Sequence, residues 1–406
     1  MRILVVTQYF WPENFRINDL VQALSDRGHQ ITILTGEPNY PSGKFFPEYL
    51  ANKSGFNDFN GTQVIRIPVV ARKNNRISLF LNYISFIISA TLIGVWKLRQ
   101  DPFDVIFVYE PSPITVGIPA ALFKKIKKAP IVFWVLDLWP HTLQAVGIIK
   151  SQFLLHLVGK IVKFVYSHCD LILAQSRSFI RYIKQYSPSH VPVEYFPNWA
   201  ESIFDVFPDI PAPEIKKRPD EFILMFAGNL GSAQDFLSIL KTAEILKYDK
   251  SIRWIILGDG REREWLEKEI KLRDLTDQFE LIGTFPVDRM PSFFMHADAL
   301  IVTLKDEPIF AMTIPGKLQS YLASGIPILG MINGEGAKII KDNNVGMCAP
   351  ASSPVEFANV IRDFKMLPKE KSGEMGICAR NLYELEFSRE KLIKKIEKKL
   401  LNLKLK

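Results

Sequence analysis

The stretch ADALIVTLKDEPIFAMTIPGKLQSYLASGIPIL, from Ala297 to Leu329, decides the fold of this chain. It reads as a buried strand, a polar loop, a helix with Pro315 at its first position followed by Gly316 and Lys317, and a new strand. A helix N-terminus offers unpaired main-chain N–H groups and about half a positive charge, and a lysine there adds a full one. The pattern indicates an anion site suited to a diphosphate, although a plain helix start explains this stretch alone equally well.

Short apolar runs alternate with longer amphipathic ones along the chain, which is typical of parallel sheets. The expected strands are 3–9, 30–36, 62–68, 104–110, 130–137, 171–175 and 193–197, then 222–229, 252–260, 279–285, 299–304, 327–332 and 345–350. The segment 196–222 is rich in proline and has no usable period, which is typical of a linker. We therefore predict an α/β protein of two doubly wound, Rossmann-like domains facing a cleft: 1–199, a linker 200–222, 223–385, and a basic C-terminal helix 386–406 that packs back toward the first domain.

The composition describes an ordinary globular protein. The chain has 406 residues, of which 48% are hydrophobic and 23% charged, and this length favours two domains. Three cysteines, Cys169, Cys348 and Cys378, are far apart and lack metal-ligand spacing, so a reducing cytosol fits better than a disulfide framework or a zinc site. The N-terminal run MRILVVTQYF is expected to be a buried strand and not a signal peptide.

The charge is unevenly distributed. Residues 1–199 hold 21 Lys and Arg against 12 Asp and Glu, residues 200–388 hold 22 against 29, and the tail 389–406 holds 8 against 2. A basic first half and a basic amphipathic tail indicate a face that meets an anionic partner, either a membrane surface or nucleic acid. An ordinary solvated surface is the alternative interpretation.

The segment Ile77 to Trp96 favours the membrane. It approaches the roughly 20 apolar residues that a crossing requires, but polar residues such as Asn82 and Ser85 dilute it and basic residues flank both ends. We expect one helix that lies against a bilayer, with packing into the domain core and a transmembrane span as the alternatives. No zinc, homeodomain or RNA-recognition pattern occurs, so we expect no nucleic-acid partner.

Two glycine loops follow the first two strands of the second half. They are AGNLGSAQDF (Ala227 to Phe236) and LGDGRER (Leu257 to Arg263). Ligands of open α/β sheets collect at the carboxyl ends of strands, so these loops are candidates for a binding site. Neither loop is a GxGxxG or Walker motif, which leaves nicotinamide or ATP binding without support and a plain tight turn as the alternative.

Together and in this order, the features resemble family four of the GT-B fold glycosyltransferases, a retaining group that uses nucleotide sugars. The resemblance covers nearly the whole chain and rests on RGH (Arg27 to His29), the two glycine loops and PGKLQSYLASGIPI (Pro315 to Ile328). The narrower resemblance is to the bacterial O-antigen and colanic-acid type. It rests on QYFWPENFRI (Gln8 to Ile17), NYPSGKF (Asn39 to Phe45) and LDLWPHTLQAVG (Leu136 to Gly147).

The chain departs from the family pattern where the donor binds. Ser320 stands where the second glutamate of the family motif would hold the ribose, and Met312 stands at the first. Asn229 and Gln234 stand where an arginine and a lysine commonly neutralise the diphosphate. We expect Lys317, the main-chain amides of 315–318 and Arg261 to supply this charge, because the departing diphosphate needs it as its own negative charge develops.

The resemblance implies that an acceptor hydroxyl replaces the nucleoside diphosphate at the anomeric carbon with retention. We nominate Asp137 and Glu13 to take the proton and orient the hydroxyl, with Lys317 as the third catalytic residue. A capping role for Asp137 and an ion pair between Glu13 and Arg16 are the structural alternatives. Glu335 and Glu307 compete to contact the ribose.

The expected donor site combines the glycine loops with the start of the helix at 315. Its residues are Gly228, Asn229, Gly231, Gln234, Gly258, Asp259, Arg261, Glu307, Pro315, Gly316, Lys317, Gln319, Ser320, Tyr321 and Glu335. The expected acceptor site lies in the first domain, and its residues are Trp11, Asn14, Asn39, Tyr40, Trp139 and His141.

The resemblance implies a UDP-linked N-acetyl-L-fucosamine or a related deoxyamino sugar as donor and a lipid-diphosphate-linked saccharide as acceptor. It also implies a cytoplasmic protein held peripherally at an anionic inner-membrane surface. No DxD tripeptide occurs near a strand end, so we expect no obligatory metal and no other cofactor. The alternatives are a sugar-nucleotide epimerase or hydrolase of the same fold and an inactive donor-binding partner.

Overall fold

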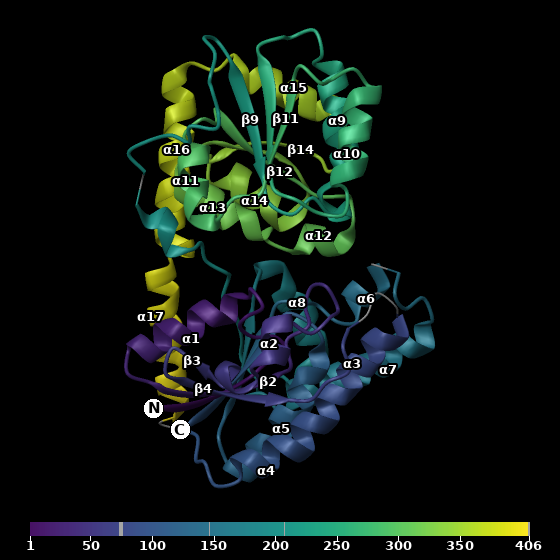
Figure 1. Ribbon diagram of the computed structural model, residues 1–406, viewed down its shortest axis with the longest axis vertical. Coiled ribbons are helices and arrows are strands. Elements are labelled where there is room, and N and C mark those ends of the chain that lie inside the picture. Colours follow the sequence, from purple (N-terminus) through teal and green to yellow (C-terminus); the bar gives the residue numbers. More distant parts are fainter. Residues whose placement is uncertain (73–75, 146, 207, 405–406) are drawn as a thin grey trace. The chain divides into compact units, whose positions relative to one another are not determined.

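The computed structural model describes residues 1–72, 76–145, 147–206 and 208–404. The chain divides into two compact units (Figure 1). The first unit comprises Met1–Phe196 and Ile393–Lys406, and the second comprises Pro197–Leu392.

The first unit is built on a sheet in the order β3-β4-β2-β1-β5-β6-β7-β8, in which only the β3–β4 pair is antiparallel. Its central strand carries four consecutive buried residues from Ile3 to Val6, as a strand covered on both faces requires. The strands are β1 (Arg2–Val6), β2 (Gln30–Gly36), β3 (Asp58–Phe59), β4 (Thr62–Ile67), β5 (Val105–Glu110), β6 (Ile131–Val135), β7 (Leu171–Ala174) and β8 (Val193–Tyr195).

Amphipathic helices cover this sheet. The first of them buries Ile17, Leu20, Val21 and Leu24 on one face, and the chain leaves it through Gly28 at φ 81°. The helices are α1 (Arg16–Asp26), α2 (Pro47–Ala51), α3 (Arg76–Ser89), α4 (Val95–Leu98), α5 (Gly117–Lys127), α6 (His141–Ala145), α7 (Gln152–Ser167) and α8 (Arg177–Tyr186), with short turns η1 (Ser54–Phe56), η2 (Ala90–Gly94) and η3 (Ile114–Val116).

The second unit has an all-parallel sheet in the order β11-β10-β9-β12-β13-β14. The strands are β9 (Phe222–Ala227), β10 (Ile252–Leu257), β11 (Phe279–Gly283), β12 (Ala299–Thr303), β13 (Ile328–Met331) and β14 (Gly346–Ala349). The helices are α9 (Phe236–Ile245), α10 (Arg263–Leu272), α11 (Met290–Phe294), α12 (Pro308–Met312), α13 (Gly316–Ser324), α14 (Gly334–Asp342), α15 (Pro354–Lys365) and α16 (Lys369–Leu382), with turns η4 (Ser202–Asp205), η5 (Ser232–Gln234), η6 (Val287–Arg289) and η7 (Tyr383–Phe387).

The segment 200–222, expected to be a linker, is instead packed into the second unit. Phe204 is buried and stacks on Phe294 with ring centroids 5.8 Å apart. The Ala212 carbonyl lies 2.8 Å from Nε2 of the buried His296. The prediction followed the proline-rich composition and overlooked the few apolar residues that hold this segment in place. The second unit begins at Pro197.

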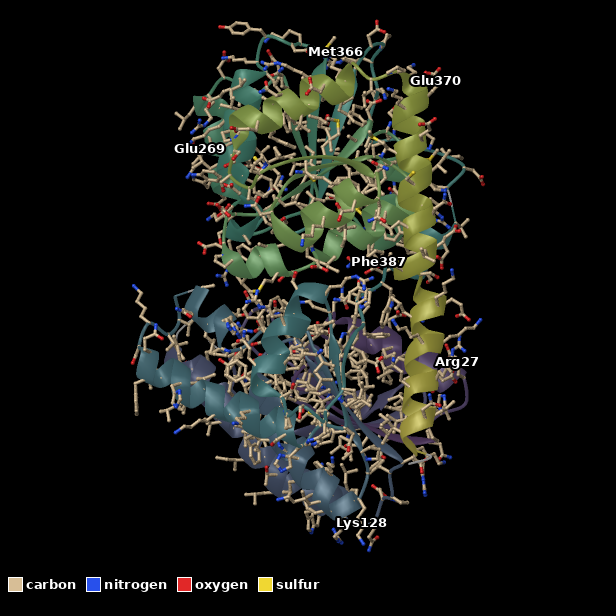
Figure 2. All side chains as sticks on the ribbon, turned by 180° about the vertical axis from the view of Figure 1, so that it is seen from behind. Arg27, Lys128, Glu269, Met366, Glu370 and Phe387 are labelled. Atoms are coloured by element: carbon tan, nitrogen blue, oxygen red, sulfur yellow. The ribbon has the colours of Figure 1, made fainter. Side chains whose placement is uncertain are left out.

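The last helix, α17 (Arg389–Lys404), belongs to the first unit from Ile393 onward. Its Glu397 lies 3.2 Å from Arg27 Nη1 and 2.8 Å from His29 Nε2, and Figure 2 shows Arg27 beside this helix. Lys399 on the same helix pairs with Glu194.

The apolar segment that starts at Ile77 forms a continuous helix through α3, η2 and α4. Within the described residues, Ile77–Leu98 is the one helix whose length and mean hydropathy would suffice to cross a membrane. Phe86, Ala90 and Leu98 are buried whereas Ile77, Phe80 and Trp96 are exposed, so one face of this helix packs into the first unit and the other is uncovered.

Candidate functional site

Both sheets reverse their strand order at one place. In the first unit this place lies between β1 and β5, and in the second between β9 and β12. The loops at the carboxyl ends of strands near such a switch point form the usual ligand crevice of open α/β sheets. The residues selected from the sequence follow β1, β2 and β6 in the first unit and β9, β10, β12 and β13 in the second.

The two glycine loops of the second unit lie against each other. The Gly228 N–H donates to the Leu257 carbonyl at 2.9 Å, and the Leu230 N–H donates to the Asp259 carbonyl at 2.8 Å. Gly258 has φ 130°, and a Cβ there would lie 1.9 Å from the Gly228 carbonyl oxygen. Only glycine allows this approach, so the loops form one continuous backbone surface.

The helix α13 begins at Gly316, one residue later than the sequence predicted, because Pro315 is its N-cap. Pro315 has no N–H, and the N–H of Leu318 donates to the Pro315 carbonyl at 2.9 Å. The expectation that all amides of 315–318 face an anion is therefore wrong. The first two N–H groups, of Gly316 and Lys317, have no acceptor among the residues that the structure describes.

Lys317 brings the two parts of the predicted donor site together. Its Nζ donates to Gln234 Oε1 at 2.8 Å and lies 3.4 Å from the centroid of the Phe226 ring. A Cβ on Gly228 would lie 3.4 Å from the same Nζ. Desolvation lowers the pKa of the Lys317 ammonium well below its usual value. A half-buried ammonium beside an open glycine loop is suited to an anionic ligand.

Two residues expected to touch the donor are used within the fold. Tyr321 is buried, and its hydroxyl accepts from the Ala227 N–H at 2.8 Å and donates to the Ala227 carbonyl at 3.2 Å. Gln319 is buried, and its amide nitrogen donates to the Pro315 and Gly316 carbonyls at 3.1 and 2.7 Å. Tyr321 therefore ties α13 to the end of β9, Gln319 bonds the start of its own helix, and both polar groups are used within the fold.

The other donor candidates are more dispersed. Asn229, Asp259 and Arg261 are exposed on the glycine loops, and the Asn229 amide lies beside Gly231. Ser320 Oγ donates to Glu201 Oε2 at 3.4 Å.

The two carboxyls that compete for the ribose lie on different helices. Glu307 is exposed and is the N-cap residue of α12, whereas Glu335 is buried in the first turn of α14.

Glu13 in the first unit is surrounded by main-chain donors. Its Oε1 accepts from the N–H groups of Asn39 and Tyr40 at 2.8 and 2.7 Å, and its Oε2 accepts from Phe10 at 3.1 Å. Burial outweighs these bonds and raises the pKa of Glu13 to about 7. This carboxyl ties the loop after β1 to the loop after β2, which favours a positioning role over proton transfer.

Asp137 lies beside a carboxyl that sequence reasoning missed. Its Oδ2 accepts from Trp139 Nε1 at 2.9 Å, and its N–H donates to Glu110 Oε2 at 3.4 Å. Glu110 is fully buried at the end of β5, and its Oε1 has no partner among the described residues. Desolvation raises the pKa of both carboxyls, that of Glu110 most strongly. The signal available in the sequence was a glutamate that ends an otherwise apolar strand.

The remaining acceptor candidates line two clusters of the first unit. Tyr40 packs between Tyr9 and Phe15 at centroid distances of 5.4 and 5.2 Å, and Trp11 stacks on Phe56 at 4.9 Å. The Asn39 side chain donates a hydrogen bond to the Glu37 carbonyl and accepts one from the Arg72 N–H. Asn14 is exposed.

The other two candidates follow β6. The Trp139 ring lies 6.0 Å from the Tyr83 ring, and the His141 ring lies 4.9 Å from the Tyr182 ring. Nδ1 of His141 has no hydrogen-bond partner among the residues described.

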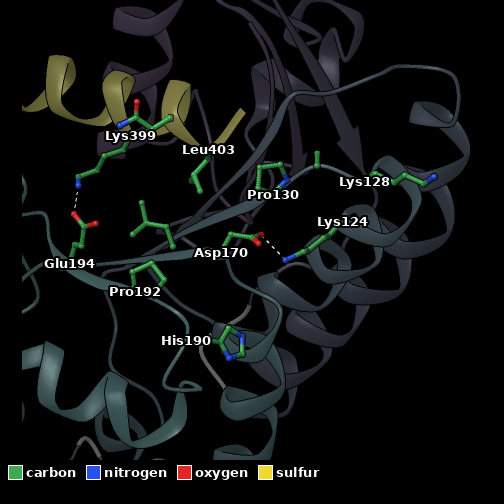
Figure 3. A pocket seen from close by; sticks show the side chains of 12 residues that line it. Lys124, Lys128, Pro130, Asp170, His190, Pro192, Glu194, Lys399 and Leu403 are labelled. Atoms are coloured by element: carbon green, nitrogen blue, oxygen red, sulfur yellow. Dashed lines mark hydrogen bonds and ion pairs between the residues drawn. The ribbon is translucent and has the colours of Figure 1, made fainter. Parts of the chain in front are cut away.

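A hollow of about 880 Å³ lies elsewhere in the first unit (Figure 3). It is lined by residues at the amino ends of β6, β7 and β8, at the edge of the sheet opposite Asp137 and Glu13. Lys124 and Asp170 form an ion pair of 2.6 Å in it. Its position separates it from the candidate site. Among the described residues no group of three or more His, Cys, Asp and Glu side chains could hold a metal ion.

Two Rossmann-like units with parallel sheets and ligand loops at their switch points define the GT-B class of fold. Residues 14–199 match the family model described as Glycosyl transferase 4-like domain, and residues 211–381 match the model described as Glycosyl transferases group 1. Each half of the chain thus matches a glycosyl transferase family model, and the protein is a glycosyltransferase.

Known proteins similar to this chain agree with that assignment. It is 26% identical over 238 residues to the probable glycosyltransferase WbjE of Pseudomonas aeruginosa, covering 56% of this chain and 58% of WbjE. It is 24% identical over 339 residues to the putative colanic acid biosynthesis glycosyl transferase WcaI of Escherichia coli K12, covering 80% and 82%. The structure of Anabaena HepE in complex with UDP has the same fold, with a TM-score of 0.71 and 13% identity over 99% of this chain and 100% of HepE.

Proposed function

We propose that this protein transfers a deoxyamino sugar from a UDP donor to a lipid-linked saccharide during the synthesis of a bacterial surface polysaccharide. The observation that carries the proposal is the convergence of Lys317, Gln234 and the paired glycine loops at the switch point of the second sheet. WcaI is named for colanic acid biosynthesis, and HepE was solved with UDP, which supports the substrate classes.

The second unit would bind the donor diphosphate. The Gly316 and Lys317 amides and the Lys317 ammonium supply positive potential, while Gly228 lets phosphate oxygens approach the backbone. Positive charge held at this place stabilises the diphosphate more strongly as its bond to the anomeric carbon breaks, because its negative charge then increases.

The first unit would prepare the acceptor. Asp137 Oδ2, oriented by Trp139 Nε1, takes the proton of the acceptor hydroxyl as the oxygen forms its bond to the anomeric carbon. The nucleoside diphosphate leaves with the bonding electrons, and attack on the face it vacates gives retention without a covalent sugar–enzyme intermediate. Glu13 holds the two acceptor loops together through the Asn39 and Tyr40 amides.

A lipid-linked acceptor would place the enzyme at the cytoplasmic face of the inner membrane as a peripheral protein. The helix Ile77–Leu98 supports a peripheral position, since large apolar side chains such as Ile77, Phe80 and Trp96 are exposed on it. The basic residues of the first half favour an anionic surface.

Turnover of UDP-N-acetyl-L-fucosamine with a lipid-diphosphate N-acetylglucosamine acceptor tests the proposal. We expect UDP release and a lipid product heavier by one deoxyamino sugar, with both lost in Asp137→Asn. UDP release without a lipid product, also in the absence of acceptor, would instead indicate the hydrolase. Tight UDP binding with no turnover of any donor would indicate an inactive donor-binding partner.

A further inference from the structure

The helix that runs from Ile77 to Leu98 carries an exposed apolar stripe. Ile77, Phe80, Leu92 and Trp96 are 75%, 62%, 65% and 62% exposed, and Ile88 is 53% exposed. Their spacing places them along the side that faces away from the sheet. Buried residues such as Phe86 and Ala90 occupy the opposite side, so both faces of the helix are apolar and only one is covered by protein.

A second helix repeats this pattern. On α7, Phe153, Leu154, Leu157 and Phe164 are 70%, 47%, 39% and 46% exposed, whereas Leu155, Val162 and Val165 are buried. Phe153, Leu157 and Phe164 follow one line along the helix surface, and Lys160 stands in the same line. A lysine there can extend its ammonium to the headgroup level while its stem stays among apolar groups.

The two stripes belong to the same side of the first unit. Both α3 and α7 pack against the short helix η3, and α5 packs against α7. Figure 1 shows α3, α4, α5 and α7 gathered on one side of this unit.

The helices on this side carry no acidic residue. No Asp or Glu occurs between Asp58 and Asp101, and Asp137 is the only one between Glu110 and Asp170. Exposed basic residues border the stripes, among them Lys97, Arg99, Lys125, Lys128, Lys150, Lys160 and Lys163. An exposed apolar surface with a purely basic border matches a bilayer that contains anionic lipid.

We propose that α3–α4 and α7 together form a docking surface that inserts side by side into the headgroup layer of an anionic bilayer. The inference deepens the proposed function, since it identifies the surface that would meet a membrane-bound acceptor. A second copy of the chain is a poor occupant, because the basic border of one copy would face the basic border of the other.

Vesicle co-sedimentation of the full chain tests this surface. The vesicles are phosphatidylcholine alone and phosphatidylcholine mixed with phosphatidylglycerol. The apolar variants are Phe80→Ser with Trp96→Ser on the first helix and Phe153→Ser with Phe164→Ser on the second. The matched control is Tyr248→Ser with Leu272→Ser, which removes side chains that are 93% and 78% exposed on the second unit.

We expect binding to the mixed vesicles that weakens with salt and is about tenfold or more lower in each apolar variant. Lys160→Gln with Lys163→Gln should lower binding by roughly fivefold per charge, whereas Lys241→Gln with Lys268→Gln on the second unit should leave it unchanged. The control apolar variant should bind like the native chain.

Equal binding to both kinds of vesicle, or loss of binding in the first-helix variant alone, would overturn the proposal. A stable dimer in sedimentation equilibrium that the stripe variants dissociate would also overturn it, by assigning the surface to a second copy. Titration with UDP separates this proposal from the transferase: chains that bind UDP but no vesicle retain the proposed function and lose the docking surface.

Discussion

Lys317 and Gln234 are joined by a hydrogen bond of 2.8 Å from Nζ to Oε1, which connects the start of α13 to the loop after β9. The partner is a neutral amide, and desolvation lowers the pKa of this lysine. Such a bond satisfies one ammonium proton without neutralising its charge. The site is thus prepared for an anion that arrives from outside the protein.

Replacing Lys317 should weaken donor binding. A hydrogen bond to a charged group contributes about 1.5–3 kcal/mol, so Lys317→Met should lower UDP affinity by roughly ten- to a hundredfold. Isothermal titration calorimetry measures this change. Lys305→Met, which removes an exposed lysine of the loop after β12, is the control and should bind UDP like the native chain. Unchanged affinity in Lys317→Met would remove this residue from the donor site.

Donor binding should take up protons. The pKa of Lys317 is lowered in the free protein, and a bound diphosphate raises it again, so protonation and binding favour each other. UDP affinity should therefore rise as the pH falls through the range between the two pKa values of Lys317. Calorimetry in two buffers with different ionisation enthalpies counts the protons, and an uptake that persists in Lys317→Met would point to another group.

Asp137→Asn should separate binding from chemistry. The amide keeps the size of the side chain but does not accept the acceptor's proton, so turnover should fall about a hundredfold or more while UDP affinity is preserved. Because the pKa of Asp137 is raised, the native rate should decline as the pH falls through that value. Initial rates across pH measure both effects, and a variant with native turnover would exclude Asp137 as the base.

Glu110→Gln should change stability in the direction opposite to most buried substitutions. A carboxyl whose pKa is raised on folding binds its proton more tightly in the native state, so stability falls as the pH rises above about 4.3, the ordinary value. The neutral amide removes this dependence, and Glu110→Gln should be the more stable form at neutral pH. Urea unfolding, followed by hydrogen exchange of the β5 and β6 amides, measures the difference. A variant that stays less stable than the native chain at every pH would contradict it.

Glu13→Gln supplies the contrasting case. Both oxygens of Glu13 accept hydrogen bonds from main-chain N–H groups, Oε1 from Asn39 and Tyr40 and Oε2 from Phe10. A glutamine replaces one of these oxygens by an NH₂ group, which cannot accept a hydrogen bond from an N–H. The unpaired group should cost about 1–3 kcal/mol. The amides of Asn39 and Tyr40 should then exchange faster with solvent. Native protection of these amides would show that the bonds do not hold the loops.

The sheets could be predicted from the sequence because buried parallel strands are continuous apolar runs. The runs at 3–9 and 299–304, for example, contain β1 and β12. The ligand loops could be predicted as well, since they follow such strands. The sequence does not show which polar side chains form hydrogen bonds within the fold, because their partners are distant in the chain. The Tyr321 hydroxyl, for example, is hydrogen-bonded to Ala227, 94 residues away.

Glu110 and the segment 200–222 escaped prediction for related reasons. A glutamate at the end of an apolar strand looks like the first residue of a solvated loop, and only the neighbouring strand β6 shows that it is enclosed beside Asp137. A proline-rich stretch looks extended and open, and only the fold shows that Phe204 meets Phe294.

The path of α17 has a consequence for the order of synthesis. The first unit takes its last helical segment from Ile393 onward, after the whole second unit has been made. During translation Arg27, His29 and Glu194 are therefore synthesised long before their ion-pair partners. Those partners, Glu397 and Lys399, follow only after the almost two hundred residues of the second unit. The second domain can therefore fold before the first is complete, because the first domain lacks this helical segment until the residues from Ile393 onward have been synthesised.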